Sequence, residues 1–461
     1  MGTHSRVLPG VAAACLVLGG CAGSTDDHAS GGSGPGGSAG AGGAGNGGTS
    51  GTGGQEAEGA RFWEDLEGDA MCPTLGRPGA EQRPPTSDGE NTVIHLVMTQ
   101  VDLGDGGPIP RPDAQAWKNI GFNLDRSCNF ASWPEGVLTA DQLDACSRLD
   151  RRACHNDFQN VADGDYCRDN ALGGLFGIAA LSPILGDPFR LNGGDWNCAL
   201  RQGAMSIVFG ISEYNGDLND DHVRLDVYSS VGITDPVAWN CRSGPGNASP
   251  LAPDWSKQAE VPRTKTFQIA ERDVVMGFPQ ENDLPPFSKW ADTNAYVRAG
   301  WLIAQLPDTT ELWFNGFNAE TPGMRLLLNR PIIAARLQRD TDGRWEFSSA
   351  TLGATSKAAD TINSFREIGF CENLCDSYST TAGYINQTVD MLSTTYEPMP
   401  DVSCDALSFG MEFAAKQYDK FKVVAVPAPP DVSEGKCGTP RNPDVPKPGC
   451  VCAQPPESGC F

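Results

Sequence analysis

Basic residues are scarce in this chain. Of its 461 residues, 34 are lysine or arginine and 58 are aspartate or glutamate, which gives a formal net charge of −24 at pH 7. Because a protein that binds nucleic-acid phosphates needs a basic face, the composition argues against a nucleic-acid partner. A strongly acidic surface is compatible instead with a solvated protein outside the cytoplasm and with cation binding.

Long apolar runs and familiar catalytic motifs are missing as well. Beyond the N-terminal segment, no stretch holds about 18 consecutive apolar residues, so no membrane-spanning helix is expected there. The chain after residue 60 contains no GxSxG, HExxH or P-loop motif. It contains three histidines: His95 is expected to pack within a strand, His155 stands beside cysteines, and His222 follows an acidic loop. The sequence therefore identifies no catalytic residue.

The first 21 residues have the plan of a lipoprotein signal. His4 and Arg6 are basic, and the apolar run from Val7 to Gly20 is too short to span a bilayer, which needs roughly 20 residues. Leu18-Gly19-Gly20-Cys21 has the form of a lipobox, an aliphatic residue and two small ones before cysteine. This pattern predicts that residues 1–20 are removed and that Cys21 carries the lipid. Two or more acyl chains on Cys21 would anchor the protein stably. The alternative is an ordinary signal peptide with a chance cysteine.

Residues 21–60 are expected to be the attachment point and a flexible tether. This stretch consists almost entirely of glycine, serine, alanine and threonine and cannot bury apolar surface. Its expected root-mean-square reach is roughly 35 Å. Ala22 stands where an aspartate often retains lipoproteins at an inner membrane, so an outer-membrane or cell-surface location is expected. A β-rich domain over 61–425 and a Pro/Cys-rich tail over 426–461 would follow.

Cysteine is abundant, with 16 residues in the chain. Cys15 leaves with the signal and Cys21 carries lipid, which leaves an even number for up to seven disulfides in an oxidising compartment. The spacings Cys371-x₃-Cys375 and Cys450-x-Cys452 lack the paired CxxC pattern of zinc sites. Four cysteines lie in the tail, which two disulfides are expected to staple. The disulfide candidates are Cys72, Cys128, Cys146, Cys154, Cys167, Cys198, Cys241, Cys371, Cys375, Cys404, Cys437, Cys450, Cys452 and Cys460.

Several segments alternate apolar and polar residues with period two, which predicts half-buried strands. Residues 91–101 and 404–413 follow this pattern, and 205–230 and 331–350 each predict a hairpin, the second turning at Asp342-Gly343. The faces expected to be buried are Ile94, Leu96 and Met98; Ile207, Phe209 and Ile211; Val223, Leu225 and Val227; and Leu407, Phe409, Met411 and Phe413.

Helices are fewer, and their order excludes two fold classes. A capping box at Thr139–Gln142, a stripe of Ala358, Ile362, Phe365 and Ile368 ending at Gly369, and a short stripe of Ile385, Val389 and Leu392 predict three of them. Regular β-α alternation is absent, which argues against a parallel barrel or a doubly wound sheet. We therefore predict a mainly β, antiparallel, sandwich-like domain of jelly-roll or lectin-like type, with a few inserted helices and disulfide staples. Residues 242–263 are expected to form a long loop, with a joint between two domains as the alternative.

Two acidic segments could hold structural calcium, the single cofactor that the sequence suggests. Asp217-x-Asn219-x-Asp221 matches the first half of a calcium loop, but His222 and Tyr228 then occupy positions that require glycine and glutamate. A polar hairpin turn is the favoured alternative. The second candidate groups Asp163, Asp165, Asp169 and Asn170 around Cys167, and a polar turn is again favoured.

Tryptophan offers a further alternative. Trp301 and Trp313 are expected in strands or the core. Four others in loop-like contexts could stack on sugars, although packing is the commoner role; they are Trp133, Trp196, Trp239 and Trp290.

Three segments carry a resemblance to a known family. "WKNIGFNLDRSC" from Trp117, "ISEYNGDLNDDHVRLDVYSS" from Ile211 and "CDALSFGMEF" from Cys404 resemble segments of a large family of predicted myxobacterial lipoproteins, which also carry a lipobox and a Gly-rich tether. The resemblance spans roughly Val93 to Phe413. The family has no established activity, so the resemblance implies location and architecture and transfers no catalytic residue.

The sequence favours a lipid-anchored, extracytoplasmic binding or interaction module. Its expected partners are the membrane, through the lipid, and glycans or other envelope components. Two alternatives stay open: a structural envelope or spore-coat component, and a secreted polysaccharide hydrolase that uses an Asp/Glu pair.

The anchored, disulfide-bonded form has a definite mass. Protein extracted from native membranes should begin at Cys21, carry the mass of diacylglycerol and gain about 14 hydrogens on reduction. Intact mass spectrometry with and without reductant measures both features. A soluble, unlipidated species would contradict the anchor, and free thiols would contradict the disulfides.

Overall fold

The computed structural model describes residues 61–63, 76–86, 89, 91–107, 113, 115–126, 146–147, 163–181, 193–236, 254–256, 265–275, 287–314, 324–367, 382–383, 385–386 and 388–425. All of them belong to one compact unit, Gln55–Phe461. The predicted signal, Cys21, the tether and the tail over 426–461 lie outside the described residues, as does the capping box at Thr139–Gln142.

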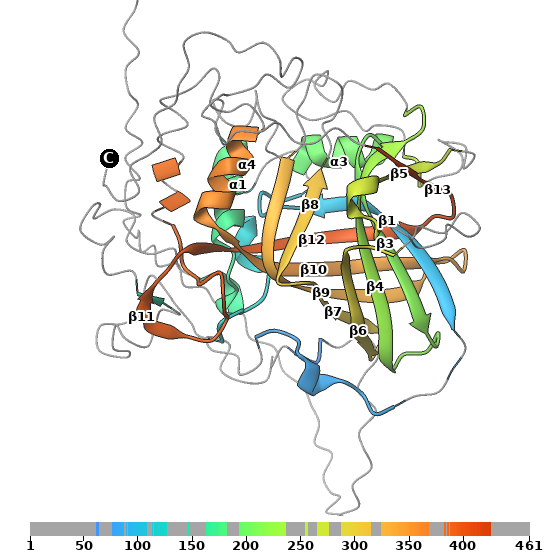
Figure 1. Ribbon diagram of the computed structural model, residues 1–461, viewed down its shortest axis with the longest axis horizontal. Coiled ribbons are helices and arrows are strands. Elements are labelled where there is room, and N and C mark those ends of the chain that lie inside the picture. The colour runs from blue at the N-terminus through green and yellow to red at the C-terminus, as the bar shows by residue number, and fades with distance from the viewer. Residues whose placement is uncertain are drawn as a thin grey trace, which may run out of the picture. The chain divides into compact units, whose positions relative to one another are not determined.

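Eight antiparallel strands close into a barrel (Figure 1). The order around it is β4-β3-β1-β12-β10-β9-β7-β6, and β6 pairs with β4 to complete the circle. The strands are β1 (Thr92–Asp102), β3 (Ser206–Tyr214), β4 (Asp220–Ile233), β6 (Trp290–Arg298), β7 (Trp301–Gln305), β9 (Met324–Arg339), β10 (Trp345–Lys357) and β12 (Ala406–Gln417).

Other strands and short helices surround this barrel. β5 (Phe267–Ala270) pairs with the last part of β4 and in parallel with β13 (Phe421–Val424), while β8 (Thr309–Phe314) pairs with β9. β2 (Cys146–Ser147) and β11 (Met399–Ser403) form a separate parallel pair. The helices are α1 (Ala171–Leu181), α3 (Gly193–Gln202) and α4 (Ala358–Glu367), with the 3₁₀ turns η1 (Ala80–Gln82), η2 (Ala116–Asn119), η4 (Asp165–Cys167) and η6 (Glu271–Asp273).

The prediction of a mainly β, antiparallel fold with a few helices is confirmed, but the sandwich is wrong. Closure depends on one edge of β4, where Asp220 pairs with Val297 and Val227 pairs with Trp290 of β6. Period-two alternation shows that a strand buries one face. It does not tell whether that face packs on a second sheet or on the far wall of the same sheet.

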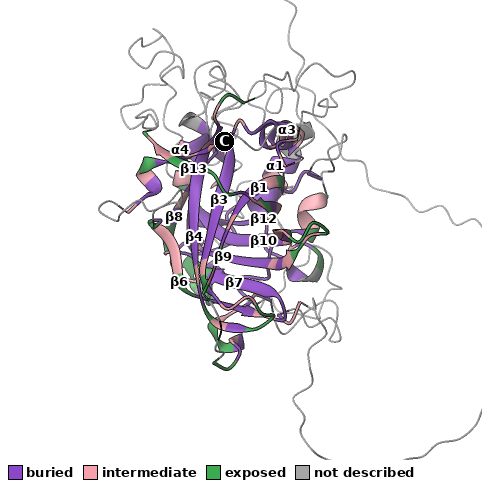
Figure 2. Ribbon diagram, turned by 90° about the vertical axis from the view of Figure 1, so that its right-hand side faces the viewer, coloured by how far each residue is buried: buried purple, intermediate pink, exposed green. Residues whose placement is uncertain are grey.

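The inner faces of the strands fill the barrel. Ile94, Leu96 and Met98 of β1 share one apolar cluster with the predicted faces of β3, β4 and β12, so these face assignments are confirmed. Phe209 stacks on Phe413 with ring centroids 5.2 Å apart. An eight-stranded barrel is just wide enough for side chains to fill, and most of the length of these strands is buried (Figure 2).

A second apolar cluster covers the outer face of β1, β3 and β4. Val97 and Val208 point away from the barrel interior and pack with Trp255, Phe267 and Phe421. The β5–β13 ribbon supplies Phe267 and Phe421. These three barrel strands are therefore buried on both faces, which explains their dense apolar content.

Both predicted hairpins are confirmed. β3 and β4 pair across the 215–219 loop, and β9 and β10 pair across Asp342-Gly343, where Gly343 adopts φ +76°. A positive φ is readily adopted by glycine because it has no Cβ.

Helix prediction was partly successful. α4 covers most of its predicted stripe, but Ile368 and Gly369 lie outside the described residues. α1 and α3 were missed, because α1 is apolar over nearly its whole length and both show buried residues on several sides, so neither has a one-sided stripe. The three helices lie on the same side of the barrel in Figures 1 and 2. None of the described helices has the length and apolar character needed to cross a membrane.

The disulfide prediction is confirmed where the structure describes cysteines. Cys146 and Cys404 are bonded, joining the β2–β11 region over 258 residues of sequence, and Cys167 and Cys198 are also disulfide-bonded. The remaining candidates lie outside the described residues: Cys72, Cys128, Cys154, Cys241, Cys371, Cys375, Cys437, Cys450, Cys452 and Cys460.

Trp63 fastens the N-terminal segment to the barrel. Its side chain is 1% exposed, and its ring lies 5.0 Å from Trp301 of β7 and 6.4 Å from Phe122. Arg61 stacks over the same Trp301 ring. Together with the neighbouring Phe62, which also packs against the core, Trp63 joins the segment that follows the predicted tether to the barrel.

Replacing Trp63 by alanine should destabilise the fold by about 3–5 kcal/mol, because it removes a large buried side chain and leaves a cavity. Denaturant unfolding measures the free-energy change. Phe287→Ala is the matched control, since this aromatic residue is 41% exposed and should cost much less. Equal losses for the two variants would contradict the role given to Trp63.

Candidate functional site

The first acidic loop lies in the turn between β3 and β4, and its side-chain oxygens accept hydrogen bonds from backbone N–H groups. The Asn219 Oδ1 accepts a hydrogen bond from the Ala299 N–H at 3.0 Å. The Asp217 N–H donates to Asn215, and the carboxylate of the intervening Asp220 accepts from two backbone N–H groups of this turn. The favoured polar-turn interpretation agrees with these contacts.

In the second acidic segment the structure separates residues that the sequence groups. Asp165 is exposed and Asp163 is half-buried, while Asp169 and Asn170 are buried. The Asn170 Oδ1 caps α1 by accepting from the Gly173 N–H, and it also accepts from the Gly410 N–H at 2.7 Å.

The Asp169 carboxylate likewise ties one backbone segment to another. It accepts from the Leu124 N–H at 2.6 Å. Burial, together with the neighbouring carboxylates of Asp125, Asp163 and Asp390, raises the pKa of Asp169 well above its ordinary value. Among the described residues, no group of three or more histidine, cysteine, aspartate or glutamate side chains is arranged to hold a metal ion. Structural calcium in either segment stays a prediction.

The structure describes four of the six tryptophans to which the sequence assigned a role. Trp301 and Trp313 lie buried in β7 and β8 as expected. Trp196 is 2% exposed in α3 and packs 4.6 Å from Phe314, so it is no sugar platform. Trp290 is half-buried and its indole N–H donates to Asp273. Trp133 and Trp239 lie outside the described residues.

One hollow among the described residues lies on the outer face of the barrel, where two β-bulges meet opposite one residue. In β1, Met98 and Val101 both point into the core, so Thr99 and Gln100 between them both point outward. In β10, Phe347 and Ala350 both point inward, which turns Ser348 and Ser349 outward. An extra residue of this kind disrupts the ladder locally and re-aims side chains.

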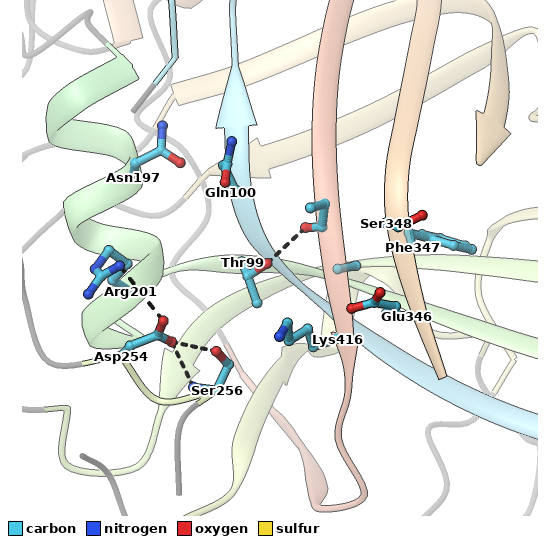
Figure 3. Close-up of a pocket in the computed structure, with 12 residues that line it drawn as sticks. Thr99, Gln100, Asn197, Arg201, Asp254, Ser256, Glu346, Phe347, Ser348 and Lys416 are labelled. Carbon is cyan, nitrogen blue, oxygen red and sulfur yellow. Dashed lines mark hydrogen bonds and ion pairs between the residues drawn. The ribbon is translucent and has the colours of Figure 1, made fainter. Parts of the chain in front are cut away.

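Ala414 of β12 lies between these two bulges. Its neighbours Phe413 and Ala415 pair with the residues that flank each bulge, so Ala414 faces outward between them. Its small side chain lets the surface dip, and a pocket of about 320 Å³ forms there. Figure 3 shows the bulged strands around it, with the Phe347 ring turned away. We name this pocket the double-bulge hollow, lined by Thr99, Gln100, Asn197, Arg201, Asp254, Ser256, Glu346, Phe347, Ser348, Ala414, Ala415 and Lys416.

Helix α3 forms one wall of the hollow, and hydrogen bonds fix it in place. The Asn197 amide accepts from the Val101 N–H at 2.9 Å and donates to the Val101 carbonyl at 2.6 Å. Trp255 is buried, and its indole N–H donates to the Leu200 carbonyl at 2.8 Å. This anchors the 254–256 segment at the C-terminal end of α3. The wall is therefore held to β1 directly beside the bulge.

Charges of both signs line the hollow. Arg201 lies 3.7 Å from Asp254, whose carboxylate also accepts from the Ser256 N–H and hydroxyl. On the facing wall, Glu346 accepts from the Gln338 amide at 3.1 Å. Both carboxylates therefore already have protein partners.

Lys416 differs from these groups. It pairs in register with Glu346 on β10, yet its ammonium makes no hydrogen bond or ion pair with any residue that the structure describes. Figure 3 shows its side chain on the side of β12 that faces the hollow.

No residue of the double-bulge hollow is predicted as a site residue from the amino-acid pattern. A signal was present: the apolar period of two breaks between Met98 and Val101, and again between Phe347 and Ala350, where core residues stand three apart. Such a break predicts a bulge. That both bulges face the same Ala414 depends on strand register, which the sequence does not display.

Comparison with known proteins adds no relative: no protein-family model, no curated protein and no solved structure matches this chain. The resemblance to myxobacterial lipoproteins therefore stays a prediction, and the site is interpreted from its own geometry.

His95 lies on the outer face of β1, with its ring 5.4 Å from Phe421. Burial lowers the pKa of His95 to about 4, against a weaker opposing effect of Asp419. The site that it occupies favours the neutral imidazole. This agrees with the expectation of a packed side chain.

His95 should make the fold sensitive to acid. The unfolded chain binds the proton near pH 6.5 and the folded chain binds it only near pH 4, so stability falls as the pH drops through that window. In His95→Gln the loss over this window should be smaller. Denaturant unfolding at several pH values gives the free energy of unfolding of both proteins. Burial raises the pKa of Asp105 to about 6, which has the opposite effect on stability. Because Asp105 is present in both proteins, its contribution cancels when their free energies are subtracted. Parallel pH profiles would contradict the assignment.

Proposed function

We propose that the protein is an extracytoplasmic binding module, held to a membrane by lipid on Cys21 and a flexible tether, whose barrel carries a small polar ligand in the double-bulge hollow. The observation that carries the binding role is the meeting of two β-bulges opposite Ala414. β-bulges are over-represented beside functional sites. The anchor is supported by the lipobox and the Gly-rich segment that follows it.

The outer hollow is a better candidate than the barrel interior. The interior is occupied by side chains, including the stacked Phe209 and Phe413. The hollow instead presents hydroxyl, amide and charged groups on walls that hydrogen bonds hold in place. Preorganised polar groups of this kind orient a small ligand at low entropic cost. The mixture of polar groups fits a hydroxylated molecule such as a sugar.

A bulky side chain at the rim of the hollow should abolish binding without unfolding the barrel. Ser348 is exposed and lies in the β10 bulge, so Ser348→Trp fills the hollow from one side. Gln100→Trp fills it from the β1 bulge and gives an independent block. We expect a member of a panel of neutral sugars, sugar acids and amino acids to raise the melting temperature of the wild type and of neither variant.

Thr341→Trp is the matched control. This exposed residue lies in the β9–β10 turn, outside the hollow, so the variant should respond to ligand as the wild type does. Circular dichroism shows whether each variant keeps the fold. Folded Ser348→Trp and Gln100→Trp proteins that still bind would overturn the assignment of the hollow.

A further inference from the structure

The balance of donors and acceptors in the double-bulge hollow indicates the chemistry of its ligand. Both lining carboxylates are engaged: Asp254 with Arg201 and Ser256, and Glu346 with Gln338. Asp254 accepts two hydrogen bonds from Ser256 beside the Arg201 guanidinium, and Glu346 accepts one from Gln338. Each carboxylate therefore already has a donor partner in the protein.

Lys416 has no such partner among the described residues. The Lys416 ammonium carries three donors and makes no contact of this kind with a described residue. Ser348 and Gln100, on the two bulges, are exposed and add a hydroxyl and an amide. A ligand that complements this arrangement brings acceptors, and one of them carries negative charge.

We propose that the double-bulge hollow binds a hydroxylated carboxylate, a sugar acid, whose carboxylate is held by Lys416 and whose hydroxyl groups meet Ser348 and Gln100. This inference rests on the proposed binding function and names its ligand class. Because the chain has a net charge of −24, an anion meets an unfavourable overall field. A local cation is therefore needed to hold it.

The first test is isothermal titration of the purified full chain with glucuronate and with glucose, which differ in the carboxylate. Wild-type protein should bind glucuronate more tightly. Lys416→Met should weaken glucuronate binding about 10- to 100-fold, the value of a hydrogen bond to a charged group, and leave glucose unchanged. Lys416→Arg keeps the positive charge and should retain most of the affinity for glucuronate.

Two further variants sharpen the result. Lys357→Met removes an exposed lysine of β10 that does not line the hollow, and it should bind as the wild type does. Glu346→Gln removes a negative charge beside the bound carboxylate, so it should strengthen glucuronate binding about two- to fivefold. Structural damage would weaken binding, whereas this variant is expected to strengthen it.

The outcomes separate this inference from the proposed function. If both sugars bind equally and Lys416→Met changes neither affinity, the sugar-acid class is wrong, while blocking by Ser348→Trp still supports the hollow as a binding site. If neither sugar gives heat, the sugar-acid inference is likewise overturned. If no member of the wider panel binds, the proposed function fails with it.

Discussion

The sheet closes through one edge of β4, and this closure sets the arrangement of the other strands. The first part of this edge pairs with β6 and completes the barrel, and the part from Ser230 to Ile233 pairs with β5 instead. Backbone N–H and C=O groups along an open edge need partners. Along β4 these partners are supplied first by β6 and then by β5. Because β5 also pairs with β13, the same edge of β4 holds the β5–β13 ribbon in place.

That outer layer determines where a site can form. Over β3, β4 and the part of β1 around Val97, the outer face of the barrel is covered by Phe267, Phe421 and Trp255. The uncovered part lies over β12 and β10, beyond the Trp255 segment and beside α3. Trp255 contributes to both regions, because it packs into the outer cluster and holds Asp254 and Ser256 against Arg201.

The two bulges give this uncovered surface its chemical character. Regular strands would place one outward residue between Met98 and Val101 and one between Phe347 and Ala350, and each bulge places two. Each bulge therefore adds an outward side chain to this surface. The small side chain of Ala414, between the two bulges, leaves the space that forms the hollow. Strands whose residues alternate between the two faces can thus carry a polar site on the outer face of the barrel. The apolar interior, on which the stability of the fold depends, stays closed.

Which residues of a strand face the core can be predicted from the amino-acid pattern, because burial of one face imposes a period of two that is visible in β1, β3, β4 and β12. The turn at Asp342-Gly343 and the presence of disulfides can be predicted as well, because they depend on local chemistry. Closure of the sheet cannot be predicted in this way, since Asp220 and Val297 are 77 residues apart and no local pattern records their pairing. The same holds for the hollow: its two bulges come from segments about 250 residues apart, and strand register alone brings Gln100 and Ser348 to opposite sides of Ala414.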